Sequence, residues 1–271
     1  MQGFQRLEHL LQAVKNRPIN HERDLLLECT AVAKSLAAEP GYSSRDACLF
    51  RERHNFTQEL IDYETQLEND QYQSELFSQN NIENWIQDYN HFERFNSLVD
   101  QTITLINQID KRNRIRIIFI GTGAFPLTTI ALAKAFPSVS ILSIEKYFSV
   151  AQNAKHVISK FKSITNTTVI CSDILHYCNK FQKNDIVVCS FIVGQQLQVD
   201  GTLEQLHHAV LKKQGTIIFR GASHAVESLY HPITFDRTYE LEIPALDHEF
   251  QEHKAYGNSA SKKLRKYEPV L

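Results

Sequence analysis

The sequence has no long run of apolar residues. A helix that crosses a membrane needs about 20 consecutive, predominantly apolar residues, and no stretch of the 271-residue chain approaches that length. The N-terminus is polar and lacks the apolar segment of a signal peptide. We therefore expect a cytoplasmic protein that makes no contact with a membrane.

An excess of charge of either sign is also missing. The 29 Lys and Arg residues nearly balance the 31 Asp and Glu residues, which gives a formal net charge of −2. Proteins that bind nucleic acid or anionic membranes usually carry a basic surface. The densest basic cluster, Lys262–Lys266, lies close to the C-terminus and is interpreted as a solvated segment. We therefore expect no nucleic-acid partner.

The residue patterns that hold a metal are missing as well. The five cysteines are odd in number and have no CxxC spacing, so we expect reduced thiols, with Cys171 and Cys189 inside buried strands. Among the twelve histidines, the neighbours His207 and His208 would diverge on a helix, because they lack the i, i+4 spacing of a helical metal pair. We therefore expect no protein-bound metal.

Glycine is scarce, with nine residues, and two of them stand in one motif. The apolar run Ile115–Ile120 predicts a strand, Gly121–Gly123 follows it, and Leu127–Phe136 has the pattern of an amphipathic helix. Such a unit opens a doubly wound α/β domain, where glycines let the backbone approach a ligand. Pro126 stands where the third glycine of the dinucleotide fingerprint would fall, which favours a cofactor without phosphates. A tight turn without a ligand is the alternative.

Four further strands are predicted, and each ends at residues that suit a ligand. They are Val139–Ile144 before Glu145, Thr167–Cys171 before Ser172 and Asp173, Asp185–Cys189 before Ser190–Gly194, and Thr216–Phe219 before Arg220–Ser223. An acid after the second strand is placed to bind ribose hydroxyls, and one after the third can accept a hydrogen bond from the adenine amine. Either acid alone could simply cap its strand. Because parallel strands end at one edge of a sheet, the set predicts S-adenosylmethionine (SAM) as the ligand.

Several segments carry a narrower resemblance. Phe119–Thr128 resembles the strand-one motif of nicotianamine synthases and of the related bacterial synthases that make opine metallophores of the staphylopine and pseudopaline type. Ser190–Gly194 is similar to that family's Ala-Ala-Leu-Val-Gly turn. Arg220–Ala225 with Leu229–Pro232 is similar to its Arg-Ser-Ala-x-Gly-Ala and Leu-Tyr-Pro segments, and Tyr89–Phe92 is similar to its aromatic helix.

The resemblance implies a helical N-terminal domain over the mouth of a Rossmann-like domain. Residues 1–110 agree with this, because they are poor in glycine and carry apolar residues at helical spacing, such as Phe4, Leu7 and Leu10. We expect an all-α domain at 1–110 and, at 111–271, an α/β domain with the doubly wound, Rossmann-like sheet of class I SAM transferases. Its last strands should follow Tyr239, where Leu241–Ile243 gives the clearest signal.

The resemblance also implies a reaction other than methylation. Enzymes of this family use SAM as a co-substrate, move its 2-aminobutanoyl (3-amino-3-carboxypropyl) group to an amine, and release methylthioadenosine. For this chain it implies a small amino acid as acceptor, with histidine first and glutamate or a second SAM-derived unit as alternatives, in the biosynthesis of a nicotianamine-like or opine metallophore. A homodimer is a further arrangement to consider. Two other functions stay open, a small-molecule SAM-dependent methyltransferase and a non-catalytic SAM-binding regulatory protein.

The candidate SAM-binding residues lie at the ends of the predicted strands. They are Gly121, Thr122, Gly123, Ala124, Phe125, Glu145, Lys146, Asp173, Ile174, Ser190, Phe191 and Gly194. The first five would bring the backbone close to the ligand, and the others would surround its ribose and adenine.

The candidate base lies on the helix before the glycine turn. By the resemblance, a functional Glu of the family falls at Val99 of this chain, which is a departure from the family pattern. The neighbouring Asp100, or Glu93 about two turns earlier, could keep the attacking amine neutral. A solvated surface charge is the alternative for each acid.

Two further candidates concern substrate contacts. Some relatives carry a tyrosine where this chain has Phe125, and Tyr89 or Tyr230 could supply the missing phenol. Arg220 could clamp a carboxylate of the substrate or of SAM through its guanidinium group. An ion pair that stiffens the strand end is the alternative for Arg220.

Overall fold

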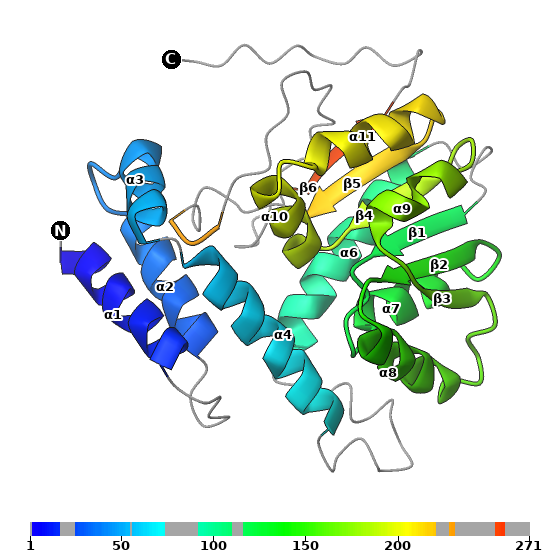
Figure 1. The fold of residues 1–271 in the computed structure, drawn as a ribbon, viewed down its shortest axis with the longest axis horizontal. Helices are drawn as coiled ribbons and strands as arrows, with labels where there is room; N and C mark the ends of the chain where they lie inside the picture. Colours follow the sequence, from blue (N-terminus) through cyan, green and yellow to red (C-terminus); the bar gives the residue numbers. More distant parts are fainter. Residues whose placement is uncertain are drawn as a thin grey trace.

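A computed structural model describes residues 2–16, 25–54, 56–73, 92–109, 116–220, 228–230 and 253–257 of the chain. Within these ranges a group of helices is followed by an α/β unit (Figure 1). The predicted fold class, a Rossmann-like sheet preceded by helices, is confirmed.

A six-stranded sheet with the order β3-β2-β1-β4-β5-β6 forms the centre of the α/β unit. The strands are β1 (Arg116–Ile120), β2 (Ser140–Glu145), β3 (Thr167–Cys171), β4 (Ile186–Cys189), β5 (Thr216–Arg220) and β6 (His253–Gly257). β1 pairs in parallel with both β2 and β4, so the order of the strands reverses there. Ligands of doubly wound sheets bind at the carboxyl ends of the strands beside such a switch point. In this sheet β6 runs antiparallel to β5.

Helices cover both faces of the sheet because its strands are apolar on both sides. The helices of this unit are α6 (Phe92–Gln108), α7 (Leu127–Ala135), α8 (Phe148–Ser159), α9 (Ile174–Tyr177), α10 (Phe191–Val199) and α11 (Leu203–Lys212). Ile117 and Phe119 of β1 pack with α6 and α7, whereas Ile118 and Ile120 point to the other face and pack with α9, α10 and α11. This two-sided burial explains the unbroken apolar runs in the sequence.

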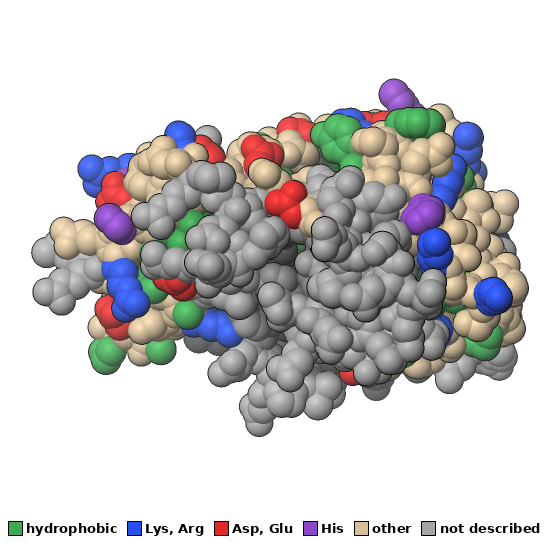
Figure 2. Space-filling view, turned by 90° about the horizontal axis from the view of Figure 1, so that it is seen from below, with side chains coloured by type: hydrophobic (Ala, Val, Ile, Leu, Met, Phe, Trp, Pro, Cys, Tyr) green, Lys and Arg blue, Asp and Glu red, His purple; other side chains and the backbone are tan. Residues whose placement is uncertain are grey.

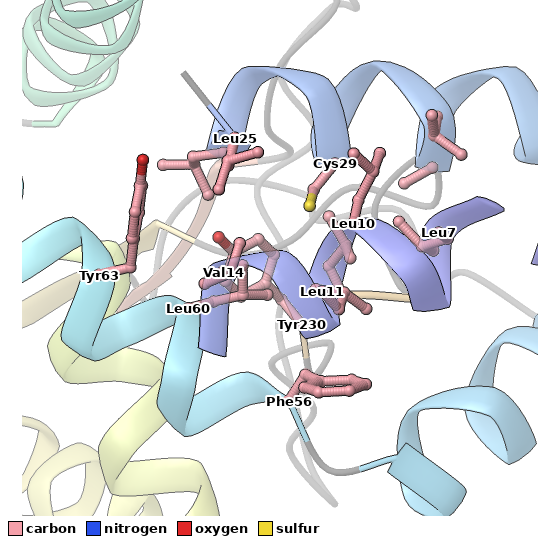
Figure 3. Packing of buried hydrophobic residues seen from close by; sticks show 14 of the residues in the cluster. Leu7, Leu10, Leu11, Val14, Leu25, Cys29, Phe56, Leu60, Tyr63 and Tyr230 are labelled. Atoms are coloured by element: carbon pink, nitrogen blue, oxygen red, sulfur yellow. The ribbon is translucent and has the colours of Figure 1, made fainter. Parts of the chain in front are cut away.

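Helices near the N-terminus form a second core. They are α1 (Gln2–Asn16), α2 (Leu25–Ala37), α3 (Ser44–His54) and α4 (Thr57–Gln73). The apolar side of α1, which includes Leu7 and Leu11, packs with Cys29 of α2 and Leu60 of α4 (Figure 3). Tyr230, which follows β5 in the chain, is buried in the same cluster.

The segment around Tyr230 joins this second core to the α/β unit. Thr57 Oγ1 donates a hydrogen bond to the carbonyl oxygen of Leu229 over 3.2 Å, and Arg51 Nη1 donates one to that of Tyr230 over 3.1 Å. The Tyr230 ring also makes an edge contact with Phe191, the first residue of α10, at a centroid distance of 4.6 Å. The start of α4 is thereby fixed relative to the carboxyl ends of the strands.

The predicted strands agree with the observed ones to within one residue at each described end. Cys171 is a correction, because it is exposed and not buried as expected. Its strand β3 lies at the edge of the sheet, where one side has no neighbouring strand. The division at residue 110 stays a prediction, and Leu105 and Ile106 of α6 pack in the core of the sheet. β6 lies in the predicted C-terminal region, whereas Leu241–Ile243 falls outside the described residues.

The described surface carries charges of both signs. Figure 2 shows Lys and Arg side chains of the described residues at both ends of one face, so they do not gather there into a single patch. None of the described helices has the length and apolar character needed to cross a bilayer.

An ion pair between the half-buried Arg116 and the buried Asp185 joins the amino ends of β1 and β4. Arg116 Nε lies 2.8 Å from Asp185 Oδ1, and Nη2 lies 2.9 Å from Oδ2. The hydrogen bond with Asp185 raises the pKa of Arg116 above its ordinary value, against the opposing effect of burial. Asp185 Oδ2 also accepts a hydrogen bond from the backbone N–H of Gln182 over 2.7 Å.

Asp185→Asn should lower the free energy of unfolding by about 3 kcal/mol, because it leaves the Arg116 guanidinium without its carboxylate. Urea denaturation of both proteins measures the difference. Glu52→Gln changes an exposed acid of α3 and should cost less than about 0.5 kcal/mol. Equal losses in the two variants would show that the ion pair does not stabilise the sheet.

Candidate active site

A cavity of about 680 Å³ opens at the carboxyl ends of the parallel strands. Its floor comes from the residues that follow β1, β2, β3 and β4, and α4 contributes the opposite wall. Its size lies within the range of small-molecule sites, and its position is the switch point between β1 and β4. All the predicted SAM-binding residues except Gly194 line this cavity.

The glycine turn is held in a conformation that other residues rarely adopt. Gly121 has a φ of 79° and Gly123 a φ of 69°. A Cβ atom at Gly121 would overlap Ser190 Oγ and Val193 Cγ2, so the turn lies directly against the start of α10. Gly194 is buried in α10, where its N–H donates to the carbonyl oxygen of Ser190, and it therefore faces the interior and not the cavity.

Glu145 binds the glycine turn directly. Its Oε2 accepts a hydrogen bond from the backbone N–H of Gly123 over 3.1 Å, and its Oε1 accepts one from that of Tyr147 over 3.2 Å. The residue is 7% exposed and lines the cavity. Each carboxylate oxygen keeps a second lone pair, so Glu145 can hold the turn and still accept a hydrogen bond from a ligand hydroxyl.

Asp173, after β3, and Lys146, after β2, form an ion pair that lines the cavity. Asp173 Oδ1 caps α9 by accepting from Leu175 N over 2.9 Å, and Oδ2 lies 3.2 Å from Lys146 Nζ. Burial alone would raise the pKa of Asp173, but the hydrogen bond from Leu175 and the pairing with Lys146 outweigh it and lower this pKa. The same pairing raises the pKa of Lys146. The pair therefore stays charged at neutral pH.

Thr122 and Ser190 add hydroxyl groups at the glycine turn. Thr122 Oγ1 is buried and has no hydrogen-bond partner among the described residues. A buried hydroxyl without a partner is costly, which makes this atom a candidate ligand contact. Ser190 caps α10, where its Oγ accepts from Val193 N.

Arg220 is buried at the floor of the cavity without a carboxylate partner among the described residues. Its Nη1 donates to Thr128 Oγ1 and its Nη2 to Thr102 Oγ1, each over 3.1 Å. Its guanidinium carbon lies 5.4 Å from the centre of the Phe119 ring, and Nε has no described partner. Burial lowers the pKa of Arg220 to about 10. The guanidinium is therefore a charged group with donor capacity left.

The predicted catalytic acids are placed less favourably. Asp100 is exposed and is not among the described residues that line the cavity, because α6 turns Val99 and Thr102 inward. Glu93 lies in the first turn of α6, and Tyr89 falls outside the described residues. The alternative phenol, Tyr230, is buried against Phe191.

The contribution of α4 to the cavity was not predicted from the sequence. Gln58, Ile61, Asp62 and Thr65 line the cavity at positions i, i+3, i+4 and i+7 of that helix. This spacing marks one face of a helix, but nothing in the local sequence shows which neighbour that face meets. Among the described residues no group of three or more His, Cys, Asp and Glu side chains is placed to hold a metal ion.

Residues 49–252 match the model of the nicotianamine synthase protein family. Two crystal structures of MtNAS are similar to the chain at 15% identity, one of a Glu-to-Gln mutant in complex with S-adenosylmethionine and one in complex with MTA and tNA. The TM-scores are 0.67 and 0.69, over 94% of this chain and 97% and 98% of the MtNAS chains. No curated protein sequence matches the chain. At this identity the likeness to MtNAS shows a shared fold.

Gly121→Ala should cost about 3 kcal/mol or more of unfolding free energy, because it combines a left-handed φ with overlap of the new Cβ. Gly201→Ala is the matched control, since Gly201 has a φ of 66° but open space around its Cβ position. That change should cost only about 1 kcal/mol. Urea denaturation compares the two, and equal costs would mean that the turn relaxes away from α10.

Proposed function

The chain belongs to the nicotianamine synthase family and is a SAM-dependent transferase, and we propose that it moves the 2-aminobutanoyl group of SAM to the amine of a small amino acid. Methylthioadenosine is the second product. SAM supplies a sulfonium group that makes the neighbouring carbon atoms electrophilic. The crystal structures of MtNAS in complex with S-adenosylmethionine and with MTA and tNA support this reaction.

The residues of the cavity fit SAM. The glycine turn leaves the backbone uncovered at the switch point, and Thr122 offers a buried hydroxyl without a described partner. We propose that Glu145, which lines the cavity, accepts from the ribose hydroxyls, and that Asp173 with Lys146 contacts the adenine. We assign the remaining contacts with SAM to Ala124, Phe125, Ile174, Ser190 and Phe191, which line the same space.

The buried charge of Arg220 is the observation that carries the proposal. Burying a charge without a counter-ion costs several kcal/mol, and no described residue provides one. A ligand carboxylate would remove this cost by forming charge-assisted hydrogen bonds with the guanidinium. The 2-aminobutanoyl group of SAM and an amino acid acceptor both carry a carboxylate. We therefore propose that Arg220 binds one of these groups and holds it for in-line attack.

The acceptor, the base and the biological setting complete the proposal. Histidine is the acceptor that we place first, with glutamate and a second SAM-derived unit as alternatives, in the biosynthesis of a nicotianamine-like or opine metallophore in the cytoplasm. Glu93 and Asp100 remain the candidates that accept the amine proton, and Tyr89 remains a candidate for the phenol that is missing at Phe125. A homodimer is the oligomeric state that we would test first.

Mass spectrometry of the protein with SAM and a pool of amino acids, including both histidine enantiomers, tests the proposal. We expect methylthioadenosine together with one amino acid that has gained an aminobutanoyl group. S-adenosylhomocysteine would instead identify a methyltransferase. Protection from thermal unfolding by SAM without any product would identify a non-catalytic SAM binder, a function favoured by the buried Val99 at the position of the family's Glu.

Arg220→Met should lower kcat/KM by about 30-fold or more, because truncating one partner of a buried charge pair costs at least about 2 kcal/mol. Steady-state kinetics measure this loss. The ligand-free variant should be less destabilised than Arg116→Met, since Arg116 has the carboxylate of Asp185 as its partner. A larger loss of stability in Arg220→Met, with unchanged kcat/KM, would make Arg220 a structural residue only.

A further inference from the structure

α4 presents Ile61 and three polar side chains to the cavity, while its other side packs in the helical core. Leu60 and Tyr63 are buried in the cluster with α1 and α2. The polar side chains are Gln58, Asp62 and Thr65, and they line the same cavity as the glycine turn. The hydrogen bond from Thr57 to Leu229 fixes the residue just before Gln58. The cavity face of α4 is therefore held in place by the packing of the opposite side of the helix and by the hydrogen bond of Thr57 at its start.

Asp62 and Asp200 have fewer partners than the other two carboxylates that line the cavity. Both oxygens of Glu145 accept backbone N–H groups, and Asp173 is used by Leu175 and Lys146. Asp200, just after α10, accepts from Gln196 Nε2 over 2.9 Å, and its charge also raises the pKa of Lys146. Among the described residues Asp62 has one partner only, Gln58, whose Nε2 donates to Oδ1 over 2.8 Å. Asp62 is exposed, and its Oδ2 has no described partner.

The Gln58–Asp62 pair offers hydrogen-bond acceptors that suit an amine. Because Gln58 uses Nε2 to orient Asp62, its Oε1 and the Asp62 Oδ2 are both acceptors without a described partner. Two acceptors on one helix face, one of them anionic, suit the N–H groups of an amine. The same cavity carries the Arg220 guanidinium on its floor. A negative charge on the α4 wall and a positive charge on the floor complement a zwitterionic amino acid.

We propose that Asp62, oriented by Gln58, binds the amine of the acceptor amino acid on α4. The inference rests on the proposed function for the identity of the acceptor, and it assigns acceptor recognition to the helical wall and SAM recognition to the sheet. Gln58 acts as a positioning residue, because its amide fixes the Asp62 carboxylate.

Steady-state kinetics of the full chain test this division. Asp62→Asn should raise KM for the acceptor about tenfold or more, because it removes the charge of a charge-assisted hydrogen bond. The KM for SAM should change less than about twofold, since its contacts lie on the sheet. Asp70→Asn is the matched control, because Asp70 is on the same helix but does not line the cavity. A change in KM for SAM equal to that for the acceptor would overturn the assignment.

A binding measurement separates this proposal from the proposed function. In the presence of methylthioadenosine, calorimetry compares histidine with 3-(imidazol-4-yl)propionate and glutamate with glutarate, each analogue lacking only the α-amine. One amino acid should bind more tightly than its analogue in the native protein, and Asp62→Asn should remove that difference without weakening the analogue. If Asp62→Asn keeps that difference, or if the native protein transfers the group to one of these amino acids but does not bind it more tightly than its analogue, the amine site is wrong. Failure of the native protein to release methylthioadenosine would instead overturn the proposed function.

Discussion

The parallel pairing of β1 with β2 and β4 leaves no space for a side chain above Gly121. The N–H of Gly121 donates to the carbonyl oxygen of Ile144, and the N–H of Ser190 donates to that of Ile120. The carboxyl ends of β1, β2 and β4 are therefore joined by backbone hydrogen bonds beside the glycine turn. A Cβ at Gly121 would overlap Ser190 and Val193. Glu145 and the start of α10 both contact the backbone of the glycine turn, which has no side chain at Gly121 or Gly123. This close contact fixes the positions of both.

The strands and the glycine turn could be predicted because their signals are local. Apolar runs such as Ile117–Ile120 are buried on both faces, and a parallel sheet covered by helices produces that pattern. Gly121 and Gly123 marked the turn because few other residues adopt a positive φ. Glu145 was predicted as a ligand-binding acid from its place after β2, but its hydrogen bond to Gly123 gives it a structural role as well.

The rest of the site could not be predicted because it depends on contacts between distant parts of the chain. Arg220 is held by Thr128 and Thr102, which lie 92 and 118 residues away in sequence. The side of α4 that faces the cavity is determined by the packing of α4 on α1 and by the hydrogen bond from Thr57 to Leu229. Asp100 was chosen by alignment with a family motif, but the rotation of α6 about its axis leaves that side chain exposed. Helical rotation is fixed by tertiary packing, which a short motif does not encode.

On the proposed role of Arg220, the stability of the folded protein depends on whether its ligands are bound. A buried guanidinium without a counter-ion raises the free energy of the ligand-free native state, and on the proposed role a bound carboxylate relieves that cost. A ligand that binds only the native state stabilises it by about 2.7 kcal/mol at 100 times its Kd. The folded fraction in a cell, and with it the resistance of the chain to proteases, would then rise and fall with the supply of SAM and amino acid.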